Sequence, residues 1–272
     1  MSGVETVAAA FAGARADRRR AALMPYMMGG YPSLAASERI GIAYARAGAD
    51  LIELGVPFSD PLADGPVIHG AATEALARGT NLDRVLEICA TVSQRVPVVV
   101  MCYANVILAR GLPRFVDALV DAGASGLIVP DMPLEEASET LQTCDERGLA
   151  LVGMVAPTTP TQRLQRIGAQ ARGFLYAVSV TGTTGQRARV DGLGAIVARA
   201  ATCTDVPVAV GFGIGTAAQA AAAADAGADG VIIGTRLVRA AGEGQDPAAS
   251  VLAVVREFAA ALASNPSDAD NG

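Results

Sequence analysis

The chain passes from a helix to a strand at Ala47-Gly48-Ala49-Asp50-Leu51-Ile52-Glu53-Leu54-Gly55-Val56-Pro57. The apolar run in this stretch is short, opens after Gly48 and closes at Gly55 and Pro57, which predicts a buried β-strand. A similar joint recurs as Ala-Gly-Ala-Ser at residues 122–125 and as Ala-Gly-Ala-Asp at residues 226–229, each time before another apolar run. A glycine supplies the left-handed residue that ends a helix, so the repeat marks a recurring helix-to-strand connection.

Apolar runs of strand length alternate with segments of helical period along the whole chain. The predicted strands are Leu23–Met28, Leu51–Val56, Val96–Tyr103, Gly126–Pro130, Leu149–Val155, Phe174–Val180, Val206–Gly211 and Gly230–Gly234. The predicted helices include Leu34–Ala47, Leu82–Arg95, Leu112–Ala122, Leu134–Arg147, Leu193–Ala200 and Ala217–Ala226. Strict alternation indicates an α/β fold with a parallel sheet, and eight units in roughly 240 residues favour a (β/α)8 TIM barrel over an open sheet.

The two ends of the chain depart from this pattern. Val4–Arg20 predicts an extra N-terminal helix that covers the bottom of the barrel. Ser264–Gly272 is rich in Ser, Asn, Pro, Asp and Gly, which predicts a disordered tail. We therefore expect one domain over residues 1–263 and a tail over residues 264–272.

The composition excludes several kinds of chemistry. All 21 basic residues are arginine, so a Schiff-base lysine or a lysine-anchored pyridoxal phosphate is impossible in this chain. His69 is the only histidine, which excludes His-rich zinc sites and argues against a Ser-His-Asp arrangement. Cys89, Cys102, Cys144 and Cys203 are far apart in sequence, as expected for buried free thiols. Carboxylate acid–base chemistry without a metal or cofactor is the main option that remains.

Charge and hydropathy limit the partners and the location. The net charge is −6 and no basic block is present, which argues against nucleic acid or an anionic membrane as a partner. The apolar runs are too short to span a membrane. The N-terminal segment lacks the apolar block of a signal peptide, so we expect a cytoplasmic protein.

Two carboxylates stand near the end of the second predicted strand. Strand alternation places Glu53 on one face with Leu51 and Gly55, and the small Gly55 leaves room above the carboxylate. Asp64 follows in a loop punctuated by prolines and glycine, where we expect it to be solvated. Barrel active sites lie at the C-terminal ends of the strands, so both acids should converge there and could divide acid and base work. The alternative is that Glu53 is a core acid paired with an arginine and Asp64 a turn former.

Glycine-rich segments follow the last three predicted strands. Gly211–Thr216 and Gly234–Arg236 allow backbone N–H groups to approach an anion, and loops after strands 7 and 8 commonly bind phosphate in these barrels. A tight turn with no ligand is the alternative. Thr181–Gly185 has the composition of a lid, or of an ordinary mobile loop.

The run Leu54–Pro61 followed by Ala63-Asp64-Gly65-Pro66 resembles the signature of the tryptophan synthase α subunit family, and the resemblance extends from about residue 21 to about residue 261. It implies retro-aldol cleavage of indole-3-glycerol phosphate to indole and glyceraldehyde 3-phosphate in tryptophan biosynthesis. By the same resemblance Glu53 and Asp64 are the catalytic carboxylates. The implied substrate-binding residues are Tyr26, Tyr103, Tyr176, Thr184, Gly185, Phe212, Gly213, Gly234 and Thr235.

The resemblance also implies a partner, a pyridoxal-phosphate β subunit in an α2β2 assembly that docks near Pro57, Asp60 and Pro133. The sequence departs from the family pattern at Met27–Gly30, at Thr235 in place of a serine, and in the lid at Val180-Thr181-Gly182. Two other functions remain open: a stand-alone indole-3-glycerol-phosphate lyase, and a non-catalytic α-like regulatory subunit.

Overall fold

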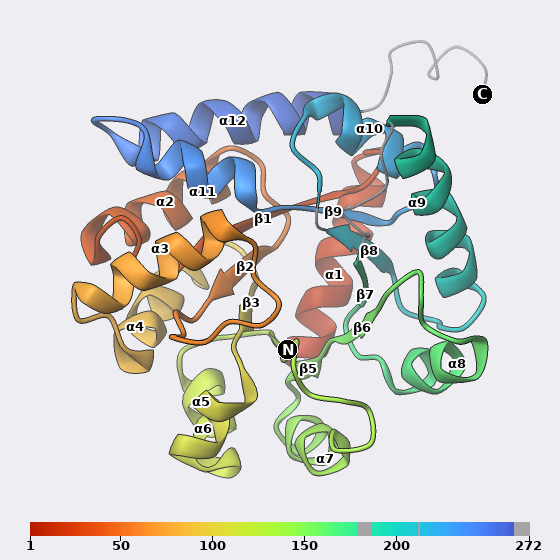
Figure 1. The fold of residues 1–272 in the computed structure, drawn as a ribbon, viewed down its shortest axis with the longest axis horizontal. Coiled ribbons are helices and arrows are strands. Elements are labelled where there is room, and N and C mark those ends of the chain that lie inside the picture. Colours follow the sequence, from red (N-terminus) through yellow and green to blue (C-terminus); the bar gives the residue numbers. More distant parts are fainter. Residues whose placement is uncertain (179–185, 212, 264–272) are drawn as a thin grey trace.

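The structure is a computed structural model that describes residues 1–178, 186–211 and 213–263 (Figure 1). Its strands form one parallel sheet in the order β5-β4-β3-β2-β1-β9-β8-β7-β6. The strands are β1 (Ala22–Met28), β2 (Ile52–Gly55), β3 (Val98–Met101), β4 (Gly126–Ile128), β5 (Ala150–Leu151), β6 (Gly153–Val155), β7 (Leu175–Val178), β8 (Val208–Gly211) and β9 (Gly230–Ile233). Only Val152 separates β5 from β6, so the two ends of the sheet are one continuous segment and the sheet curves into a nearly closed barrel. The predicted TIM barrel is confirmed.

The helices surround this barrel (Figure 1). They are α1 (Gly3–Ala16), α2 (Leu34–Arg46), α3 (Pro66–Ala77), α4 (Leu82–Val92), α5 (Ala104–Arg110), α6 (Leu112–Asp121), α7 (Ser138–Arg147), α8 (Thr161–Gln170), α9 (Gln186–Ala201), α10 (Ala217–Asp225), α11 (Thr235–Gly242) and α12 (Pro247–Leu262). The predicted start of α7 at Leu134 is wrong, because residues 131–137 form turns in which the Glu136 N–H donates to the Pro133 carbonyl. Pro66, interpreted as a loop residue, is instead the first residue of α3, where its missing N–H costs nothing.

The helix-to-strand joints are built as the repeat predicts. Gly48, Gly123 and Gly227 have φ angles of 94°, 75° and 92°, a region that side chains disfavour. Each glycine follows the last turn of α2, α6 or α10 and turns the chain into the next strand. The motif therefore fixes the connections on the N-terminal side of the barrel.

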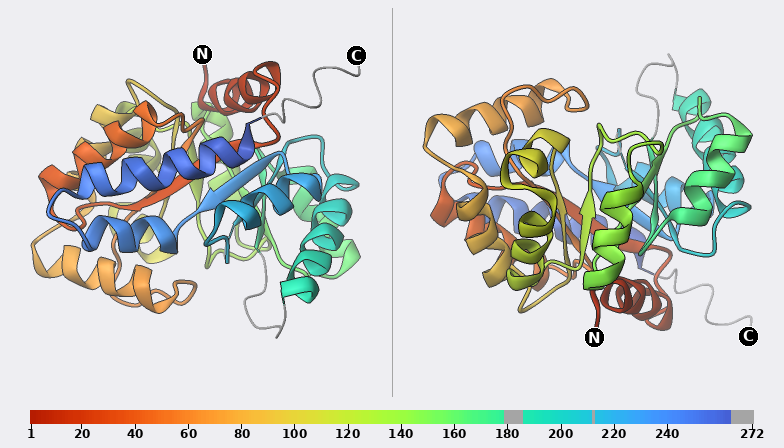
Figure 2. Two further views of the ribbon diagram at one scale, coloured as in Figure 1. Left: turned by 90° about the horizontal axis from the view of Figure 1, so that it is seen from above. Right: turned by 90° about the horizontal axis from the view of Figure 1, so that it is seen from below.

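Apolar side chains form two layers. Leu51 belongs to the cluster inside the barrel, whereas Ile52 and Leu54 belong to the cluster between the barrel and its helices, as strand alternation predicts. Helix α1 closes the end of the barrel where the strands begin, and Figure 2 shows it (red) at that end. Its Phe11 lies 5.8 Å from the Phe174 ring, centroid to centroid, and fills the space beside Gly230. The predicted N-terminal cover is confirmed, although the helix ends at Ala16.

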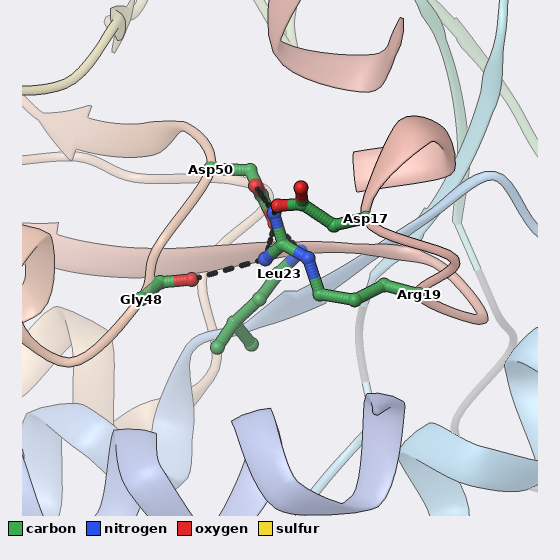
Figure 3. Close-up of polar contacts among 5 residues, drawn as sticks. All are labelled: Asp17, Arg19, Leu23, Gly48 and Asp50. Atoms are coloured by element: carbon green, nitrogen blue, oxygen red, sulfur yellow. Dashed lines mark hydrogen bonds and ion pairs between the residues drawn. The ribbon is translucent and has the colours of Figure 1, made fainter. Parts of the chain in front are cut away.

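An arginine joins α1 and β1 to the start of β2 (Figure 3). Arg19 donates to both carboxylate oxygens of Asp50, to the Gly48 carbonyl at 3.3 Å and to Asp17. Asp50 also accepts the Leu23 N–H at 2.8 Å. Burial raises the pKa of Asp50, while the Leu23 N–H and Arg19 lower it. This cluster ties three segments together at the end of the barrel opposite the predicted site.

Within the described ranges, no helix is long and apolar enough to cross a bilayer. The same residues hold no group of three or more His, Cys, Asp or Glu side chains that could bind a metal. Cys89, Cys102 and Cys144 are buried free thiols, as expected. The predicted tail at residues 264–272 lies outside the described residues.

Candidate active site

Glu53 points into the barrel from β2. It pairs in register with Tyr26 of β1 and Val99 of β3, both of which belong to the inner apolar cluster. Only 2% of its surface is exposed, and its Oε2 has no hydrogen-bond partner among the described residues. No arginine in those ranges pairs with it, so the alternative of a core acid held by an arginine is wrong.

Burial, followed by the charge of Asp64, raises the pKa of Glu53 to about 8. The buried site disfavours the carboxylate because it removes the water that solvates the charge. At neutral pH the side chain is therefore mainly a carboxylic acid, able to donate a proton. Its environment is the one that a general acid requires.

Asp64 lies in loop 2 (residues 56–65), which connects β2 to α3. The side chain expected to be solvated is only partly exposed, because Asp64 is half-buried and burial raises its pKa. A hydrogen bond from Tyr103 and the charge of His69 act in the opposite direction. Its Oδ1 has no partner among the described residues. The charge of Asp64 contributes to the raised pKa of Glu53, so the two acids lie near each other, and one oxygen of each has no partner among the described residues.

Two tyrosine side chains, Tyr26 and Tyr176, lie near the two acids. A Cβ atom on Gly55 would lie 2.2 Å from the Tyr26 hydroxyl, and one on Gly211 would lie 2.2 Å from the Tyr176 hydroxyl. The room that Gly55 leaves is thus filled by Tyr26, not left open above Glu53. Both tyrosines are buried, and nearby Glu53 and Asp64 add to the burial that raises their pKa values. The tyrosines and the acids form one electrostatically coupled cluster, in which Gly55 and Gly211 must lack side chains.

Tyr103 lies at the start of α5 and contacts loop 2. Its hydroxyl accepts the Ala63 N–H at 3.1 Å, and its ring stacks on Phe58 with a centroid distance of 5.1 Å and an interplanar angle of 23°. The sequence did not identify Phe58 or Ala63 as part of the site, because no sequence pattern shows that their loop contacts Tyr103.

A cavity of about 570 Å3 lies at the β4–β6 side of the barrel, and none of the two acids and three tyrosines of the cluster lines it. Ala63 of loop 2, Val129, Met154 and Val178 line it, together with side chains of α7 and α8. Met154 and Val178 pack against the inner apolar cluster. The cavity lining reaches the acid–tyrosine cluster at Ala63, whose N–H donates to the Tyr103 hydroxyl.

The predicted phosphate residues lie at the ends of β8 and β9. Gly234 is the N-cap of α11 and makes no side-chain capping bond, so the first N–H groups of the helix are free to face an anion. A Cβ atom on Gly234 would lie 3.8 Å from the Tyr26 Cβ, which places this helix terminus next to the acid–tyrosine cluster. Gly213 has a φ angle of 80°. The N–H groups of Gly215 and Thr216 already donate to the Gln219 side chain.

Three predicted site residues, Thr184, Gly185 and Phe212, lie outside the described residues. The structure brings the others to the C-terminal ends of the strands. Glu53, Asp64, Tyr26, Tyr103 and Tyr176 form one cluster, with Gly234 at its edge.

The chain is similar to known proteins in sequence and in fold. The sequence model of the family described as "Tryptophan synthase alpha chain" matches residues 11–265. The tryptophan synthase alpha chain of Synechococcus sp. (strain CC9902) is 48% identical over 226 residues, which cover 81% of this chain and 83% of the relative. A chain of Mycobacterium tuberculosis tryptophan synthase is 38% identical with a TM-score of 0.88, over 95% of this chain and 98% of that chain. A chain of the α2β2 complex from Pyrococcus furiosus is 33% identical with a TM-score of 0.83, over 88% and 98% of the two chains. The chain belongs to the tryptophan synthase alpha chain family, a family of lyases in tryptophan biosynthesis.

Proposed function

We propose that the chain cleaves indole-3-glycerol phosphate to indole and glyceraldehyde 3-phosphate, with Glu53 as the proton-transfer group and Asp64 as the electrostatic partner. The single observation that carries this proposal is the buried Glu53, whose pKa is raised to about 8 beside a half-buried Asp64. Two acids in unlike environments can hold different protonation states at the same pH.

The proposed reaction begins when protonated Glu53 delivers its proton to C3 of the indole ring. The positive charge that forms on the ring is stabilised by Asp64, which accepts a hydrogen bond from the ring N–H. The Glu53 carboxylate then takes the proton of the side-chain hydroxyl next to the scissile bond. The carbon–carbon bond breaks, its electron pair returns to the ring, and the side-chain carbon becomes the aldehyde. Glu53 ends protonated, so no other reactant is needed.

The rest of the cluster fits the two ends of this substrate. The rings of Tyr26, Tyr103 and Tyr176, which lie near the two acids, suit the indole. The N–H groups at the start of α11, with Gly213, Gly234 and Thr235, suit the phosphate, which these residues would bind mainly through their backbone N–H groups. Thr184, Gly185 and Phe212 complete the proposed substrate site.

The test is Glu53→Gln, which keeps the size of the side chain but cannot transfer a proton. We expect indole release to fall by at least ~10²-fold. Asp50→Asn is a matched control, because it removes a buried carboxylate at the opposite end of the barrel. Near-full activity of a folded Glu53→Gln variant would refute the mechanism, whereas equal loss in both variants would indicate damage to the fold.

The proposal includes a β subunit that docks on loop 2 and its neighbours, around Pro57, Asp60 and Pro133. The Pyrococcus furiosus relative belongs to an α2β2 complex. Asp60 is exposed, and two large apolar side chains near this face are also exposed, Leu62 by 89% and Leu108 by 72%.

The two alternatives differ in how they respond to that partner. Addition of a cognate β subunit should raise indole release at least ~10-fold, a coupling of about 1.4 kcal/mol, and Asp60→Ala should reduce this rise. Full activity without the β subunit favours a stand-alone lyase. No indole release in either condition, together with activation of the β subunit, favours a regulatory subunit.

A further inference from the structure

Tyr103 makes three separate contacts with loop 2. Its hydroxyl accepts the Ala63 N–H at 3.1 Å, and the same side chain lowers the pKa of the adjoining Asp64. Its ring stacks on Phe58, five residues before Ala63 along the same loop. One side chain therefore fixes the backbone immediately before Asp64 and packs against the first part of the loop.

Tyr103 is itself held firmly. It is only 2% exposed and follows directly on β3. The N–H of Cys102 donates to the Ile128 carbonyl at 3.0 Å, and the N–H of Ala104 donates to Asp131 Oδ1 at 2.9 Å. These bonds anchor the residues on either side of Tyr103 to the end of β4 and the loop that follows. A rigid barrel strand thus supports the tyrosine.

Loop 2 has few other supports near its acid. Ser59, Asp60 and Leu62 are exposed, and residues 56–65 contain no helix or strand. Asp64 nevertheless reaches the buried Glu53 closely enough to alter its protonation. The position of Asp64 must therefore be set by contacts from outside the loop. Tyr103 supplies one such contact, the hydrogen bond to the residue before Asp64, and it also lowers the pKa of Asp64.

We propose that Tyr103 is a positioning residue that holds Asp64 in the active site and connects it to the loops on the proposed docking face. This inference rests on the proposed role of Asp64. Tyr103 acts through Asp64 by donating its hydroxyl proton to the carboxylate, because such a bond favours the ionised acid. It also joins loop 2 to the loop after β4, where Pro133 lies. This role is additional to flanking the indole ring.

The test variant is Tyr103→Phe, which keeps the ring and its stacking on Phe58 but removes the hydroxyl. Loss of the hydrogen bond should raise the pKa of Asp64. Activity requires ionised Asp64, so it falls as pH drops through that pKa, and the acid limb of the kcat/KM profile should move to higher pH. We expect a shift of about one pH unit and a decrease of up to about tenfold at a pH on that limb. The profile is measured on the full chain with its β subunit.

A second measurement does not depend on activity. Carboxyl carbon NMR of the full chain, with the Asp64 signal assigned from the Asp64→Asn spectrum, reports the titration of Asp64 directly. Tyr44→Phe is the matched control, because it removes another buried tyrosine hydroxyl, bonded to the Tyr26 carbonyl at 3.2 Å on the outer side of the barrel. It should leave both the acid limb and the Asp64 titration at their wild-type positions. Phe58→Leu should move both in the same direction as Tyr103→Phe, by a smaller amount.

The outcomes separate the inference from the proposed function. Wild-type values of both the Asp64 titration and the acid limb in Tyr103→Phe overturn the positioning role, as does an equal shift in Tyr44→Phe. Near-full activity of Asp64→Asn overturns the electrostatic role of Asp64 instead, and the NMR titration still decides whether Tyr103 controls the carboxylate.

Discussion

The Glu53→Gln variant should become more stable than the wild type, by a margin that grows as the pH rises, even though the substitution removes activity. The folded-state pKa of Glu53 is raised from 4.5 to about 8 by burial and by Asp64. The unfolded chain releases this proton near pH 4.5, whereas the folded chain keeps it until about pH 8. The wild-type free energy of unfolding therefore falls as pH rises through this window, and a glutamine does not titrate.

The size of the effect follows from the pKa difference. A gap of about 3.5 pH units corresponds to at most about 4.8 kcal/mol, and between pH 5 and pH 7.5 the wild type should lose roughly 3 kcal/mol relative to Glu53→Gln. Other titrating groups cancel in the comparison of the two proteins. Urea unfolding of both proteins at the two pH values measures the change in their stability difference.

Thr80→Val is the control for this prediction. The Thr80 hydroxyl is buried and has no hydrogen-bond partner among the described residues, but it does not titrate. Its replacement should change the free energy of unfolding by the same amount at pH 5 and pH 7.5. A stability difference between Glu53→Gln and wild type that is also independent of pH would refute the raised pKa, and with it the assignment of Glu53 as the acid.

Three further predictions follow from the same structure. The turnover of the wild type should fall as pH rises through about 8, because the reaction begins with protonated Glu53, and a pH–rate profile checks this. Gly55→Ala should cost about 1–3 kcal/mol of stability and lower activity, because the new side chain displaces Tyr26. Gly70→Ala is the control: Gly70 has open space around it in α3, and the substitution should stabilise the protein by roughly 0.5–1 kcal/mol. Thermal unfolding and indole release measure both variants. Arg19→Met should destabilise the protein by roughly 2–3 kcal/mol, because it leaves the buried Asp50 without its ion-pair partner. Arg78→Met breaks an exposed pair with Glu74 and should cost under about 1 kcal/mol. Urea unfolding measures both variants.

The sequence predicted those parts of the structure that depend on local patterns. Alternation along β2 placed Glu53 inside the barrel and Leu54 outside it, because successive side chains on a strand point to opposite faces. The glycine joints were predicted because each requires a positive φ angle within a few residues of a helix end. The start of α7 was predicted wrongly because the apolar spacing continues through turns that precede the helix.

The environment of Asp64 could not be predicted in the same way. Pro61, Gly65 and Pro66 indicate a loop, and loops are usually exposed. The half-burial of Asp64 comes from Tyr103, which lies 39 positions later in the numbering and reaches loop 2 only because β2 and β3 are neighbours in the barrel. A contact of this kind depends on how the loops above two strands pack, which no periodic pattern encodes.

The glycines at Gly55 and Gly211 show how the site constrains the barrel that carries it. Each ends a strand, and each lies beneath the hydroxyl of a tyrosine from the preceding strand, Tyr26 above Gly55 and Tyr176 above Gly211. A side chain at either glycine would push a tyrosine toward the acids, since the rigid ring cannot shorten to make room. A packed TIM-barrel interior ordinarily favours bulky branched residues at such inward positions. The absence of a side chain at two of them is therefore a requirement of the acid–tyrosine cluster and not of the fold. Because the rings of Tyr26 and Tyr176 occupy the space that a side chain at either position would need, these two glycines mark the place where the cluster determines the packing of the barrel.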